Sequence, residues 1–145
     1  MQGLRLIIER LSADRERRAA ETFRFMEEQR IKKVLAPKQW EELRESLQKE
    51  CKSLERQSDL SFLIETPDID SLKITNAKSG RQASFAYNPD VPCISFKGYD
   101  DGGYFGFMVS ADGISVQLFD VKRTVPTSVN EITLDVMQYL VRTRR

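Results

Sequence analysis

The sequence predicts an α+β fold, with an N-terminal helical pair, an antiparallel sheet and a C-terminal helix packed on that sheet. Apolar residues recur every three or four positions over residues 1–58, as they do along an amphipathic helix. After residue 59 they alternate with polar residues, as they do along strands, and the helical spacing returns beyond Pro126. We therefore expect 1–58 to form a helical region, either an arm or part of the same domain. Residues 59–145 are expected to supply the sheet and the last helix.

Two helices joined at Pro37 are expected in the helical region. Leu4 and Leu11 start the apolar stripe of the first helix. Proline favours the first turn of a helix, so Pro37 predicts the start of a second one, antiparallel to the first. Residues 12–18 contain almost no apolar side chain. A continuous or slightly bent helix is favoured there over a break capped by Ser12.

The sheet is expected to be a meander of five or six short strands. Asp112-Gly113 is the strongest turn signal between two of them, and the last strand is expected to end at Pro126. Just before that turn, Phe105 and Phe107 share a parity and are expected to face the core.

The C-terminal helix is expected to start at a capping box, because Ser128 is followed three residues later by Glu131. Its apolar residues form two stripes, which places it between the sheet and the helical pair. The first stripe is Val129, Ile132, Val136 and Leu140, and the second is Leu134, Met137 and Val141.

Composition argues against several classes of enzyme and ligand. The chain contains no histidine, which removes Ser-His and Cys-His nucleophile pairs and most catalytic zinc sites. Asp100 and Asp101 are adjacent carboxylates before two glycines, a pattern that predicts a tight turn rather than a calcium loop. Cys51 and Cys93 show no paired spacing, and neither is expected to be reactive. No catalytic residue, cofactor or metal site is expected.

The positive charges of the first helix are expected to be neutralised along it. Formal net charge is only +1, and arginines alternate with acidic residues at helical spacing, so specific nucleic-acid binding is not expected. The least neutralised cluster is Arg30, Lys32 and Lys33, which is the candidate basic contact. The chain shows no signal peptide or spanning segment, which predicts a cytoplasmic protein without membrane insertion.

These observations favour a non-enzymatic binding or assembly module that forms a homodimer through its helices. Its expected self-association surface is the apolar stripe made by Trp40, Leu43, Leu47 and Leu54. Packing of this stripe within one chain is the competing interpretation. A small-ligand-binding domain, with a pocket between a curved sheet and the C-terminal helix, is one alternative function. A histidine-free enzyme using carboxylates is another, and an unidentified protein partner remains open.

Overall fold

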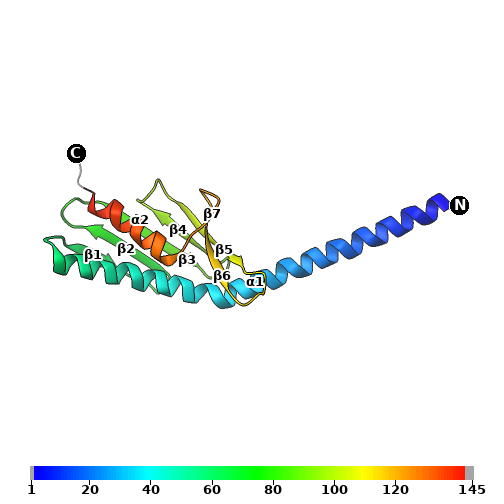
Figure 1. Cartoon of the computed structure of the whole chain (residues 1–145), viewed down its shortest axis with the longest axis horizontal. Coiled ribbons are helices and arrows are strands. Elements are labelled where there is room, and N and C mark those ends of the chain that lie inside the picture. The colour runs from blue at the N-terminus through cyan, green and yellow to red at the C-terminus, as the bar shows by residue number, and fades with distance from the viewer. Residues whose placement is uncertain (1, 143–145) are drawn as a thin grey trace.

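The computed structural model of the chain describes residues 2–142 and is an α+β fold in two layers. Helices α1 (Gln2–Gln57) and α2 (Val129–Val141) lie side by side on one face of the sheet (Figure 1). The strands are β1 (Phe62–Glu65), β2 (Ser71–Asn76), β3 (Gln82–Asn88), β4 (Cys93–Lys97), β5 (Gly103–Val109), β6 (Val116–Asp120) and β7 (Val125–Pro126). The expected fold class, antiparallel sheet and C-terminal helix are thereby confirmed.

Each strand of the sheet pairs antiparallel with the next, in the order β1 to β7. The alternation in the sequence decides which face is buried, since successive side chains of a strand point to opposite faces. Phe85 opposite Phe96, and Phe107 opposite Leu118, are cross-strand pairs on the face that the helices cover. The other face carries exposed side chains such as Tyr104 and Met108.

Seven strands are found where five or six were expected. The additional one is β7, a two-residue edge strand that includes Pro126, which the sequence suggested as a strand end. Proline is tolerated at a sheet edge because its missing N–H has no partner to lose there. Ile114, directly after the Asp112-Gly113 turn signal, lies before β6 rather than in it and is 75% exposed.

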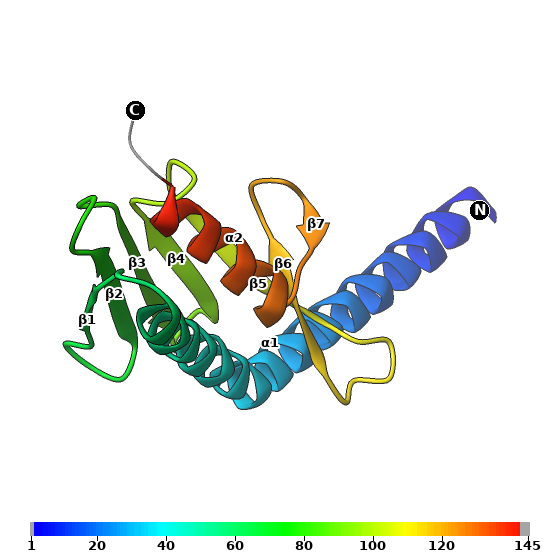
Figure 2. The same cartoon turned by 60° about the vertical axis from the view of Figure 1, so that its left-hand side comes forward.

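The expectation of two helices is wrong, because α1 is a single helix of 56 residues that runs through Pro37. At 1.5 Å per residue it is about 84 Å long. Proline inside a helix removes one hydrogen bond and kinks the axis, and the direction of α1 changes in this region (Figure 2). Ala36 and Trp40 are buried on either side of Pro37, so packing on the sheet holds the two turns together. The favoured continuous helix over residues 12–18 is confirmed.

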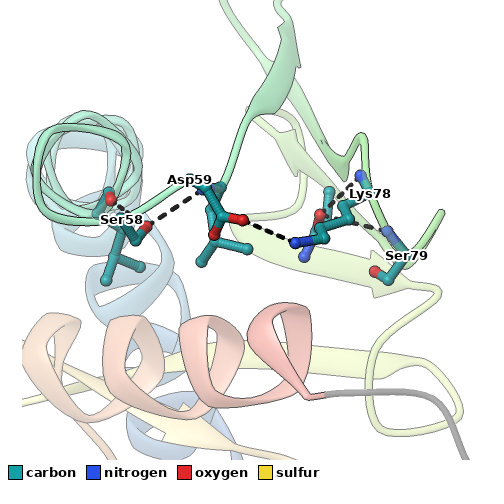
Figure 3. A network of polar contacts seen from close by, with 7 residues as sticks. Ser58, Asp59, Lys78 and Ser79 are labelled. Atoms are coloured by element: carbon teal, nitrogen blue, oxygen red, sulfur yellow. Dashed lines mark hydrogen bonds and ion pairs between the residues drawn. The ribbon is translucent and has the colours of Figure 1, made fainter.

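The end of α1 is tied to the turn between β2 and β3 (Figure 3). The Ser58 hydroxyl donates to the carbonyl of Leu54 at 2.5 Å and accepts from the N–H of Leu60 at 3.2 Å, which stops the helix. Next to it, Asp59 accepts a hydrogen bond from Lys78 Nζ at 2.8 Å, and this bond lowers the pKa of the Asp59 carboxyl. The chain therefore leaves α1 in a fixed direction and enters β1 at the sheet edge.

Helix α2 packs beside α1 rather than between α1 and the sheet. The hydroxyls of Ser46 on α1 and Thr133 on α2 are 2.8 Å apart. Ser128 caps α2, because its side-chain oxygen accepts from the N–H of Glu131 at 3.1 Å. Of the two expected stripes, the first is buried from Ile132 onward, whereas Leu134 of the second is 60% exposed. One side of α2 therefore faces solvent.

Candidate functional site

The N-terminal part of α1 projects away from the rest of the molecule (Figure 1). Every residue from 3 to 26 is exposed, and we call this segment the arm. The arm carries eight large apolar side chains, all between 56% and 67% exposed: Leu4, Leu6, Ile7, Ile8, Leu11, Phe23, Phe25 and Met26. Exposed groups of large apolar side chains mark interaction sites in proteins that are otherwise well packed.

One side of the arm continues the buried face of α1. The buried face is formed by Ala36, Trp40, Leu43, Leu47 and Cys51, which are at most 3% exposed. At 100° per residue, Leu4, Ile8, Leu11 and Met26 lie within about 80° of Ala36 around the helix axis. We call this side of α1 the seam. Polar residues separate its buried part from the arm, where no residue of the described chain (2–142) covers it.

The seam has two apolar clusters separated by a charged segment. The tip cluster lies between Leu4 and Leu11, and the base cluster between Phe23 and Met26. Between them, Asp14, Arg15 and Arg18 lie on the seam side, within about 70° of the line through Leu4 and Leu11 at 100° per residue. A partner on this face must accommodate both apolar and charged groups.

The expected neutralisation of the arginines is present in part. Ion pairs join Arg5 to Glu9 at 3.8 Å and Arg17 to Asp14 at 3.4 Å, both on exposed side chains. Exposed pairs of this type contribute a few tenths of a kcal/mol each. They support the helix but do not replace packing as its source of stability.

The expected self-association surface is not available in the structure, because most of it is core. Trp40, Leu43 and Leu47 are at most 3% exposed and Leu54 is half-buried. The indole N–H of Trp40 donates to the carbonyl of Ile69 at 3.0 Å, and its ring stacks on Tyr87 with centroids 6.1 Å apart. This stripe meets the sheet of its own chain, which was the competing interpretation.

The three residues of the candidate basic cluster have different surroundings. Arg30 donates to Glu27 at 2.9 Å, so its charge is paired on the helix surface. Lys32 is half-buried, whereas Lys33 is exposed.

A polar cleft of about 440 Å³ lies between the end of α2 and the turns that follow β4 and β6. Arg123 lies at its wall, paired with Asp100 at 2.8 Å and with buried Asp120 at 3.2 Å. Burial, with the nearby charges of Asp135 and Asp100, raises the pKa of Tyr99 to about 12. The cleft is lined by Gly98, Tyr99, Asp100, Asp101, Arg123, Asp135, Gln138, Tyr139 and Arg142.

The carboxylates at this cleft have different surroundings. Asp101 and Asp135 are exposed, and the carboxylate of Asp100 is paired with Arg123. The sequence prediction of a turn at Asp100 and Asp101 is confirmed, with both residues at positive φ (50° and 60°). Buried side chains between the sheet and the helices form the core, and the cleft lies at its margin.

Both cysteines are free thiols. Cys51 is fully buried in α1, and this burial raises the pKa of its thiol to about 12. Cys93 is half-buried, and burial raises its pKa as well. A thiol with a raised pKa is a poor nucleophile at neutral pH. Over residues 2–142, no three metal-ligating side chains gather into a cation site, and no helix is long and apolar enough to cross a membrane.

Comparison with known proteins adds no family or relative to these observations. No family model, curated protein or solved structure matches the chain.

Proposed function

We propose that this protein is a non-enzymatic assembly module that self-associates through the seam of its arm. The observation that carries the proposal is the exposed continuation of the core face, from Met26 to Leu4. A helix in water gains most of its stability from packing an apolar face, and the arm has the face without the packing. A second copy of the chain presents the same face at the same concentration, and two-fold pairing of identical surfaces is the commonest closed assembly.

The apolar surface of the seam is large enough for a moderate affinity. Six large apolar side chains of each arm lie on the seam side: Leu4, Ile7, Ile8, Leu11, Phe25 and Met26. Full burial of such a side chain is worth about 1.5–3 kcal/mol, and those of the arm are already partly covered. The gross gain for a pair is on the order of 10 kcal/mol, against an association cost of about 4 kcal/mol or more. We therefore expect a Kd of tens of micromolar.

Sedimentation equilibrium over 5–500 µM tests the proposal. The chain mass is 16.8 kDa, and we expect the average mass to approach twice this value at the highest concentration. Leu11→Asp places a charge on the seam and is expected to raise Kd at least tenfold. Leu6→Asp is the matched control. Leu6 is 59% exposed against 57% for Leu11, but lies on the far side of the helix, so Kd should change less than twofold.

Both variants should melt at the wild-type temperature when dilute, because neither side chain belongs to the core. A wild-type mass of 16.8 kDa at every concentration would reject self-association. Equal weakening by the two substitutions would reject the seam as the contact. A monomer whose arm binds lipid vesicles would replace the proposal with a membrane-surface role.

A further inference from the structure

We infer that the two arms pair antiparallel, with the two-fold axis close to residue 15. The sheet of each chain, with the parts of α1 and α2 that pack on it, is called its sheet domain, and the two sheet domains lie at opposite ends of the dimer. The inference rests on the proposed self-association and specifies its geometry. It follows from three features of α1, namely where its seam becomes covered, where its exposed apolar clusters lie, and how its charges are distributed.

The first feature is the burial of the seam by the chain's own sheet and α2. From Ala36 onward the seam is packed against the sheet and α2 of the same chain. In a parallel pair, the covered parts of the two helices would start at the same level, so the sheets of both chains would meet at the base of the arms. Helices that pack directly are only about 8–10 Å apart, which leaves no room for a sheet between them. Parallel arms would therefore have to diverge at their base.

The second feature is the position of the two apolar clusters along the arm. With an axis at residue 15, residue i lies level with residue 30 − i of the partner. Leu4 then lies level with the partner's Met26 and Leu11 with the partner's Ala19, so the outer part of each tip cluster meets a base cluster. Contacts between Leu4 and Met26 lie within the exposed residues, and Met26 is about 15 Å from the buried Ala36 at 1.5 Å per residue.

The third feature is the charged segment between the clusters. Parallel arms in register would place Asp14 opposite Asp14 and Arg18 opposite Arg18, which is unfavourable in a partly buried contact. In the antiparallel pair, Asp14 lies within one helical turn of Arg15 and Arg18 of the partner. The two Arg15 side chains approach each other at the axis, and each has the partner's Asp14 beside it. The charges of Asp14, Arg15 and Arg18 therefore favour antiparallel arms, as the burial of the seam beyond Ala36 does.

Distances between spin labels on the two copies test the orientation. Cys93→Ser removes the half-buried thiol, and Cys51 stays unlabelled because it is fully buried. A label at Arg5→Cys is expected about 30 Å from its counterpart, since residue 5 lies level with the partner's residue 25. Parallel arms would instead leave no separation along the axis and place the two labels about 20 Å apart or less, across the pair of helices. A label at Glu16→Cys is the matched control, because it is separated from its counterpart by at most about 3 Å along the axis in both orientations.

The outcomes separate the inference from the function on which it rests. A long distance at position 5 with a short one at position 16 supports antiparallel arms. Short distances at both positions would reject the orientation while leaving self-association intact. An absence of intermolecular dipolar signal at both positions, at a concentration well above the expected Kd, would reject the dimer itself.

Discussion

Gly98 lies just after β4, with φ at +76°, where L side chains are strained. A Cβ at this position would lie 2.6 Å from the carbonyl oxygen of Gln82, in the backbone of β3. Gly80 offers a matched comparison, because its φ is +78° but nothing lies within 4 Å of its Cβ position. We expect Gly80→Ala to lower the free energy of unfolding by about 1 kcal/mol and Gly98→Ala by about 3 kcal/mol or more.

Urea unfolding of the two glycine variants measures this difference. Both variants carry the cost of a positive φ at alanine. The additional loss of unfolding free energy in Gly98→Ala therefore reports the contact with the Gln82 carbonyl. Equal losses in the two variants would mean that the turn moves away from β3 at little cost.

Tyr99 predicts how stability depends on alkaline pH. Its pKa is raised from 10.0 to about 12 in the folded chain, chiefly by burial. Between these values the unfolded chain has lost the phenolic proton and the folded chain has kept it, so stability falls as the pH rises. The loss attributable to Tyr99 is on the order of 2 kcal/mol by pH 12. Below pH 10 the group makes no difference to the pH dependence.

Thermal melts of wild type and Tyr99→Phe at pH 9 and pH 11.5 measure the Tyr99 contribution. Phenylalanine cannot titrate, so the variant should lose less stability over this interval than wild type. Tyr87 and Cys51, whose pKa values are also raised by burial, contribute a decline that is common to both proteins. Identical declines in the two proteins would show that Tyr99 is solvated at high pH.

At the scale of an element, α2 has one buried side and one exposed side. Substituting one residue on each side by aspartate distinguishes the two sides. Val136 is fully buried, whereas Leu134 is 60% exposed on the same helix. Val136→Asp places an unpaired charge in the core and is expected to unfold the chain at room temperature. Leu134→Asp should change the free energy of unfolding by less than about 0.5 kcal/mol. Circular dichroism at 222 nm measures both, and a folded Val136→Asp would show that α2 is peripheral.

The strands could be predicted from sequence because alternation is a local signal. Phe105 and Phe107 occupy the buried face that the alternation predicted. Pro37 shows the limit of local signals, since its residue type predicts a helix start and the structure contains an uninterrupted helix. The burial of Ala36 and Trp40 against the sheet offsets the cost of an internal proline. That contact joins residues far apart in the sequence, and no local pattern reports it.

At the scale of the whole molecule, the sequence predicted an apolar seam but not the part of it that the chain itself covers. The spacing of Trp40, Leu43 and Leu47 shows that one face of the helix is apolar, and it does so equally for Leu4, Ile8 and Leu11. Only the position of the sheet along α1 separates the two sets. The candidate self-association surface is therefore on the arm and not at Trp40 and Leu47, which pack on the sheet.

Because α1 is one helix, the sheet domain also acts as a template for the arm. Starting a helix is the costly step, and the turns packed on the sheet have already formed it. Each further turn of the arm adds hydrogen bonds without a new nucleus, so helical order should decline gradually from residue 26 toward Gly3. A partner laid antiparallel would place its most ordered turns beside the least ordered turns of this chain. Each arm would then suppress the fraying of the other, and the two sheet domains would become the ends of one continuous, stiffened rod.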